Sequence, residues 1–87
     1  MTTLIILGHM LLVIGSADML KDCGTLRAAG CQHDDVIIFD TGQPLKGQEY
    51  TIKHEAAHWF CQRTKVRDTV HLGIWPVGFE QAWEARR

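Results

Sequence analysis

The residues best suited to chemistry lie in the segment His54-Glu55-Ala56-Ala57-His58. On a helix, positions i and i+4 project from the same face, so the two histidines can bind one metal ion at roughly 2.0 to 2.1 Å. A zinc ion at such a site lowers the pKa of its water toward about 7 and polarises a carbonyl group. Glu55 can reach that water without being a ligand, so we expect it to act as general base in amide hydrolysis.

A helix over residues 49–65 is predicted to carry this segment. Its apolar positions recur with the 3.6-residue period of an amphipathic helix, and they include Ile52, Ala56, Trp59 and Phe60. The polar residues 42–48, which include Pro44, are predicted to form a loop in front of the helix.

Three earlier segments must support the helix. Residues 4–14 form an apolar run that is compatible with a buried strand, two short strands or a helix, and we favour a strand. Ser16 stands at an N-cap position before near-helical apolar spacing, which predicts a helix over residues 17–29. Residues 35–41 are β-branched and aromatic between polar neighbours, which predicts a strand buried on both faces.

The C-terminal quarter offers further polar side chains. A connection through Asp68, His71 and Gly73 leads to Pro76, which is suited to the first turn of a last short helix running toward Ala85. That helix would present Glu80 on one face, together with the acidic residue four positions later.

Residues 50–58 and, more weakly, Gly78-Phe79-Glu80-Gln81-Ala82 resemble the zincin metallopeptidases, and the second segment is similar to the glutamate-bearing helix of gluzincins, including the small ImmA/IrrE-type peptidases. The resemblance implies an α+β fold with a backing helix, a short β-sheet whose edge strand pairs with substrate, the motif helix and a C-terminal glutamate helix. It also implies a bound Zn2+ and a peptide or protein substrate.

The resemblance implies Glu80 as third metal ligand beside His54 and His58, because gluzincins take a glutamate from a separate later helix. His71 is the alternative, since SprT-type proteases use a histidine beyond the motif helix. Asp68 is the third choice, as in zincins that use an aspartate. Peptide deformylases pair the same motif with a cysteine, but no strand that would bring Cys31 to the site is evident.

Composition bounds the remaining possibilities. The 87 residues indicate a single domain over residues 1–87, and the formal net charge of −1 without a basic stripe makes nucleic acid an unexpected partner. The apolar run of residues 4–14 is too short to cross a membrane, and we interpret it as core rather than as a signal peptide. Three cysteines form no disulfide pattern, which predicts buried thiols in a reducing cytoplasm. His9 is expected to be a core histidine.

A different class of function also fits the motif. The histidines could lie on a solvated helix face with Glu55 in a salt bridge, in a small non-catalytic binding or inhibitor protein of the phage or mobile-element type that uses the same helix as an interaction surface. A chain of 87 residues has little room for both a core and a walled cleft, so a homodimer or a protein partner could complete either kind of site.

Overall fold

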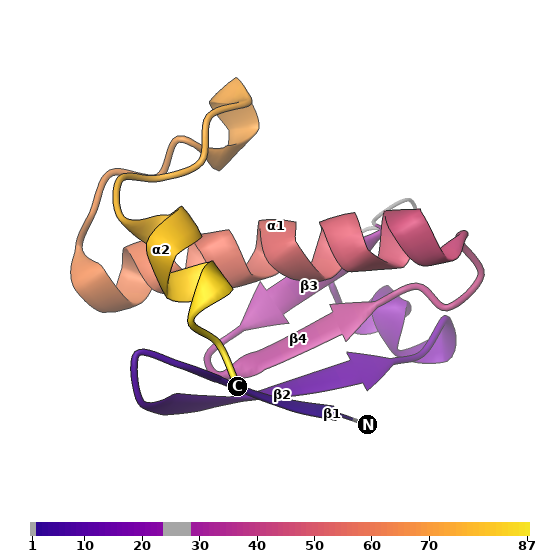
Figure 1. Cartoon of the computed structure of the whole chain (residues 1–87). Coiled ribbons are helices and arrows are strands. Elements are labelled where there is room, and N and C mark those ends of the chain that lie inside the picture. The colour runs from indigo at the N-terminus through magenta and orange to yellow at the C-terminus, as the bar shows by residue number, and fades with distance from the viewer. Residues whose placement is uncertain (1, 24–28) are drawn as a thin grey trace.

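The computed structural model describes residues 2–23 and 29–87, which form a compact α+β fold (Figure 1). The elements in this part of the chain are β1 (Thr2–Ile6), β2 (His9–Gly15), the 3₁₀ helix η1 (Asp18–Cys23), β3 (Gly30–His33), β4 (Val36–Phe39), α1 (Leu45–Thr64), the short 3₁₀ helix η2 (Val70–Leu72) and α2 (Phe79–Glu84). No helix among the described residues is both long and apolar enough to span a bilayer.

The four strands form one mixed sheet in the order β1-β2-β4-β3. β1 and β2 are antiparallel and are joined by Leu7 and Gly8, whose φ angles of 54° and 75° are the positive values that a two-residue type I′ turn requires. β2 is parallel to β4, whereas β3 is antiparallel to β4. The apolar run of residues 4–14 therefore belongs to a hairpin of two short strands and not to the single strand that was favoured, because the turn at Leu7 and Gly8 reverses the chain.

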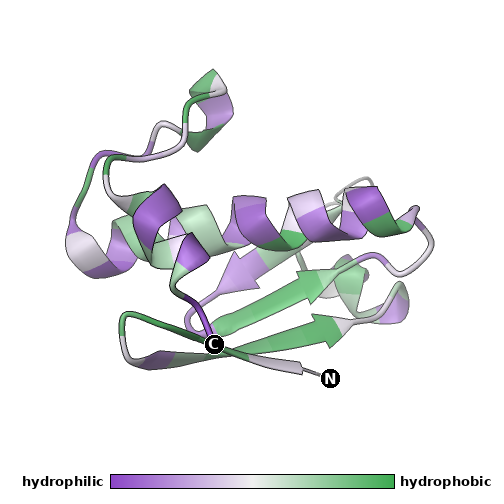
Figure 2. Ribbon diagram, in the orientation of Figure 1, coloured by the Kyte–Doolittle hydropathy of each residue, from purple (hydrophilic) through white to green (hydrophobic). Residues whose placement is uncertain are grey.

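The helical layer covers only one face of this sheet, as Figure 1 shows. Side chains alternate between the faces of a strand, so Leu11, Val13 and Ile37 point toward α1 and are buried there. Hydrophobic residues follow β2 and β4 through the middle of the sheet, while β3 at the edge is more hydrophilic (Figure 2). The strand predicted at residues 35–41 is present as β4, but it is not buried on both faces. Ile37 is fully buried under α1, whereas Val36 and Ile38 on the opposite face are only partly buried, because the helical layer covers one face of the sheet.

The helix α1 meets the sheet through Ala56, Trp59 and Phe60, and all three are buried. Phe79 of α2 packs on Phe60 of α1 with ring centroids 5.6 Å apart, which extends the core from α1 to α2. Gly30 of β3 allows close approach, since a Cβ there would lie 2.5 Å from the Thr51 Cγ2 atom of α1. The absence of a side chain at Gly30 thus lets α1 lie directly on β3.

Two predicted helix boundaries are corrected. α1 begins at Leu45 rather than at residue 49, so four of the seven residues of the predicted loop 42–48 are helical. In this first turn Gln48 N donates to Pro44 O at 3.0 Å. The added helical hydrogen bonds offset the low helix propensity of Gly47. α2 begins at Phe79, later than Pro76, because Gly78 has a φ of 85° that a helix cannot continue through.

The predictions for residues 17–29 and for the cysteines also change. Residues 18–23 form a 3₁₀ helix instead of an α-helix, and residues 24–28 of the predicted helix lie outside the described part. Cys23 and Cys31 form a disulfide, so they are not the free thiols that were expected; only the spatial pairing of η1 with β3 brings them together. Cys61 is a buried free cysteine, as predicted.

Candidate metal centre

The motif helix presents His54 and His58 one turn apart on the side of α1 that faces away from the sheet. Ala56 and Trp59 fix this orientation because their burial leaves the face with the two histidines pointing outward. The two Nε2 atoms lie 3.2 Å apart. Two ligand atoms thus come from one helix whose rotation is set by the core.

His71 of η2 completes a cluster of three imidazoles. Its Nε2 lies 3.1 Å from the Nε2 of His58, and the nitrogen atoms that the three rings offer all lie within 4.8 Å of one another. A tetrahedral zinc with bonds of roughly 2.0 to 2.1 Å separates its ligand nitrogens by about 3.4 Å. The two separations from His58 are close to that value, whereas no closer limit than 4.8 Å holds for His54 and His71, so a zinc ion would need a small adjustment of these two side chains.

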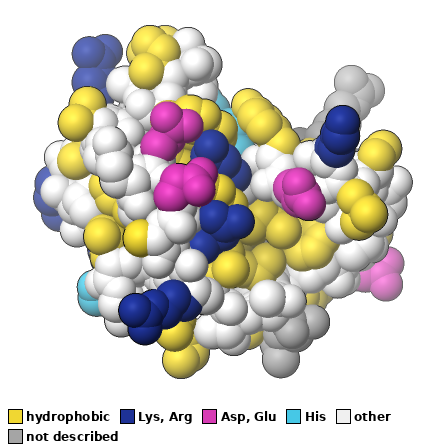
Figure 3. All heavy atoms as spheres, viewed as in Figure 1, with side chains coloured by type: hydrophobic (Ala, Val, Ile, Leu, Met, Phe, Trp, Pro, Cys, Tyr) yellow, Lys and Arg dark blue, Asp and Glu magenta, His cyan; other side chains and the backbone are white. Residues whose placement is uncertain are grey.

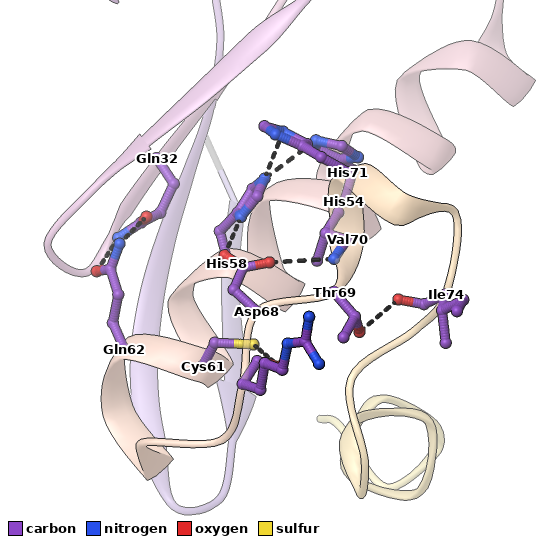
Figure 4. A network of polar contacts seen from close by, with 11 residues as sticks. Gln32, His54, His58, Cys61, Gln62, Asp68, Thr69, Val70, His71 and Ile74 are labelled. Carbon is purple, nitrogen blue, oxygen red and sulfur yellow. Dashed lines mark hydrogen bonds and ion pairs between the residues drawn. The ribbon is translucent and has the colours of Figure 1, made fainter.

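Asp68 fixes the orientation and the tautomer of His58. The Nδ1–H group of His58 donates to Asp68 Oδ2 at 2.6 Å, and an ionised carboxylate can only accept. The neutral ring therefore carries its proton on Nδ1 and leaves the Nε2 lone pair facing His54 and His71 (Figure 4). A carboxylate behind a ligating imidazole is a usual feature of metal sites and raises the basicity of the ligand.

Hydrogen bonds around η2 hold Asp68 and His71 in place. Val70 N donates to Asp68 Oδ1 at 3.1 Å, and the Thr69 hydroxyl donates to Ile74 O at 2.8 Å. Partial burial tends to raise the pKa of Asp68, but the hydrogen bonds from His58 and Val70 outweigh it and lower this pKa below its ordinary value. The carboxylate therefore stays ionised and keeps accepting from the imidazole.

The neighbouring ionisable groups respond to burial and to each other. Burial lowers the pKa of His54, and positive charge on His58 and His71 lowers it further. Burial raises the pKa of Glu55 above its ordinary value, against the opposing effect of His58 and His71. A neutral His54 is the form that binds metal, and a carboxyl group with a raised pKa is a better proton acceptor near neutral pH.

Glu55 is half-buried, and in the described part of the chain it makes no ion pair or side-chain hydrogen bond. The salt-bridged role that a solvated helix face would give it is thus not seen there. Thr51, one turn earlier, touches β3, so Glu55 lies on the flank of α1 toward β3.

Glu80, the first choice for third ligand, lies elsewhere. Its Oε1 is 3.4 Å from Lys53 Nζ, and Lys53 also lies over the Trp75 ring at 4.4 Å from the centroid. Lys53 is on a different flank of α1 from the histidines, so the short helix α2 delivers Glu80 to the wrong side of the motif. The structure instead brings the alternative, His71, to His54 and His58.

Sequence reasoning missed the role of Asp68 as partner of His58, since it ranked this residue only as a metal ligand. The available signal was the spacing of Asp68 and His71, which places both on one short turn. His9 is exposed rather than a core residue, because it lies at the start of β2, next to the β1–β2 turn, where its Nδ1 is 2.9 Å from an Arg63 guanidinium nitrogen.

Comparison with known proteins gives no assignment: no family model, no curated protein and no solved structure matches the chain.

Proposed function

We propose that the chain is a small zinc-dependent metallopeptidase in which His54, His58 and His71 bind the metal and Glu55 is the general base. The observation that carries the proposal is the convergence of three imidazole nitrogens, with 3.2 and 3.1 Å between the Nε2 of His58 and those of the other two. Three protein ligands leave the fourth position of a tetrahedral ion free, as catalytic zinc sites do. When bound, zinc supplies Lewis-acid polarisation of the scissile carbonyl and acidifies water.

The roles of the protein groups follow from their contacts. Glu55 takes a proton from the attacking water and passes it to the leaving amine, which its raised pKa favours. Asp68 is a positioning residue, because it acts through the His58 imidazole and holds its Nε2 toward the ion.

The edge strand β3 offers a place for an extended peptide. In the described residues no strand pairs with its outer side, and Gln32 of β3 exchanges side-chain hydrogen bonds of 3.1 and 3.0 Å with Gln62 of α1. Glu55 lies on this flank of the helix, so a peptide added along β3 would run past the general base. An extended segment of a peptide or protein is therefore the proposed substrate class.

Zinc stoichiometry tests the ligand set. We expect about one zinc per chain by elemental analysis in the wild type, and a loss of at least 100-fold in zinc affinity in His58→Ala and His71→Ala. Glu80→Gln is the matched control, because its partner Lys53 lies outside the cluster, and it should retain zinc. Wild-type protein without stoichiometric zinc, or zinc loss in Glu80→Gln but not in His71→Ala, would contradict the assignment.

Two further variants separate catalysis from metal binding. Glu55→Gln should keep zinc and lose peptide hydrolysis by about 100-fold or more, because the base is removed and the ligands are not. Asp68→Asn should weaken zinc binding by about 10- to 100-fold while the fold stays intact. A peptide-library assay with fluorescence readout measures the first effect, and competition with a zinc-sensitive chelator measures the second.

The second candidate function is a non-catalytic binding protein. Leu72, Ile74 and Val77 are exposed apolar residues in the segment next to His71, which is the kind of surface that contacts a partner. In that case Glu55→Gln would leave the activity of the protein unchanged, whereas Ile74→Asp would abolish partner binding.

A further inference from the structure

A cavity of about 660 Å³ lies between the sheet, α1 and the C-terminal segment, and none of the three histidines lines it. Its floor is apolar and consists of Leu4, Val13, Phe39, Ile52 and Trp83. Figure 3 shows hydrophobic side chains within a hollow that is flanked by lysine or arginine groups. The volume lies within the range of about 300 to 1,000 Å³ that is usual for sites of small ligands.

The cavity exists because α2 is too short to cover the sheet. This helix has only six residues, so no helix in the described part of the chain covers the sheet face beside α1, which lines the cavity with Leu4, Val13 and Phe39. The wall is fixed in place, since Arg87 and Ile5 exchange two backbone hydrogen bonds of 2.9 and 3.0 Å that anchor the C-terminal segment to β1. The hollow is therefore bounded by hydrogen-bonded elements on each side.

The mouth of the cavity carries an excess of positive charge. Lys46 and Lys53 are two helical turns apart on α1, and Arg86 contributes from the C-terminal segment. Arg86 is held there by its NH1 group, which donates to Trp83 O at 2.8 Å, and by its position over the Trp83 ring. Lys53 is paired with Glu80, so its charge is balanced. The remaining charged groups that line the cavity are the two cations Lys46 and Arg86 and the carboxylate of Glu49, which gives an excess of one positive charge.

We infer that this cavity binds a free medium-chain carboxylate, with its hydrocarbon chain on the apolar floor and its carboxylate at the cationic rim to which Lys46 and Arg86 contribute. A neutral apolar molecule would bury apolar surface on the floor but would not use the positive charges, and a small inorganic anion would be attracted to the positive charges but would make no apolar contact with the floor. An amphiphilic anion uses both, and the site is separate from the three histidines, so the proposal does not depend on zinc.

A chain-length series tests the floor. Octanoate, decanoate and dodecanoate, each below its micelle concentration, are titrated into ¹⁵N-labelled protein, with dodecyltrimethylammonium as the cationic control. Each buried methylene should lower the Kd by about fourfold, until the chain outgrows the cavity. The amide shifts should concentrate at cavity residues such as Val13 and Ile52.

Amino-acid substitutions test the role of the positive charges at the cavity mouth and of the space inside the cavity. Lys46→Glu and Arg86→Glu should each raise the Kd of decanoate by roughly two- to fivefold, because the contacts are exposed, whereas Lys65→Glu outside the cavity should not. Thr2→Trp should fill the mouth and weaken dodecanoate more than octanoate. The inference is overturned by equal binding of dodecyltrimethylammonium, by the absence of a chain-length effect, or by shifts centred on exposed Met10 of the other sheet face.

Discussion

The candidate centre depends at the residue scale on how each imidazole is held. His58 is fixed at both ends, with Nδ1 on Asp68 and Nε2 between two other Nε2 atoms. His54 has no such carboxylate partner in the described residues, and its ring is placed by the helix and by its contacts with the His58 and His71 rings. The two motif histidines look equivalent in the sequence, but they have different surroundings.

We predict that metal-free protein loses stability as the pH falls below about 6.5 because of His54. Burial first, and then charge on His58 and His71, lower its folded-state pKa below the ordinary 6.5, so the unfolded chain binds more protons in this range. The stabilisation is complete above pH 6.5 and is lost as the pH falls through the folded-state pKa. Urea unfolding of chelator-treated protein from about pH 5 to pH 7.5 measures the free energy of unfolding over this range.

The His54→Gln variant provides the control for this pH dependence. Glu55 acts with the opposite sign, because its raised pKa removes stability as the pH rises from 4.5, and it is present in both proteins. The difference between wild type and His54→Gln therefore isolates the histidine. A difference that does not change with pH would contradict the prediction.

At the scale of elements, the segment between α1 and α2 decides which residue joins the motif histidines. α1 ends at Thr64, and the chain then carries η2 out over the helical layer (Figure 1). η2 ends at Leu72 and is followed by Gly73, whose φ of 79° reverses the chain and whose N donates to Val70 O at 3.1 Å. This left-handed residue sets the direction in which His71 is presented.

Gly73→Ala should therefore destabilise both the turn and the metal site. A Cβ at this position meets no atom within 4 Å, so the cost comes from the backbone alone and amounts to about 1 to 2 kcal/mol. Gly73→Asn is the matched control, because asparagine tolerates the left-handed region better. The Tm of thermal unfolding and the zinc affinity should both fall more in Gly73→Ala than in Gly73→Asn. Equal losses in the two variants would argue against a backbone effect.

For the whole molecule, the two faces of the sheet are stabilised by different interactions. One face carries α1 and α2, while the opposite face has the disulfide between Cys23 and Cys31, because Cys31 points away from the side of Gly30 and Gln32. The bond ties η1 to the edge strand on which the proposed substrate would lie. The cytoplasmic location was expected because the cysteine count suggested no disulfide, and this bond removes that reason.

Removing the disulfide should cost stability throughout the molecule. The bond joins residues that are eight positions apart, and loop-closure entropy gives a contribution of about 2.5 kcal/mol for a loop of this size. The double variant Cys23→Ser/Cys31→Ser should unfold at lower urea concentration than oxidised wild type and should match reduced wild type. Titration with a thiol reagent after denaturation should find one thiol per oxidised chain; three would contradict the pairing.

The sequence by itself determined those features that depend on local spacing. The period of Ala56, Trp59 and Phe60 fixed a helix with two histidines on its outer face, and the β-branched run before Asp40 fixed a central strand. These predictions succeed because hydrophobic periodicity and strand propensity act over a few neighbouring residues. The boundaries at Leu45 and Phe79 were missed because helix ends depend on turn geometry and capping.

Only the tertiary structure decided which distant residues meet. His71 rather than Glu80 joins the motif, Asp68 stands behind His58, and Cys23 faces Cys31. Each of these pairings depends on where a loop turns and which flank of α1 it reaches, and a rotation of one residue along a helix changes that flank by about 100°. Long-range packing sets such rotations, so spacing along the chain supplies candidates for the third ligand but does not choose among them.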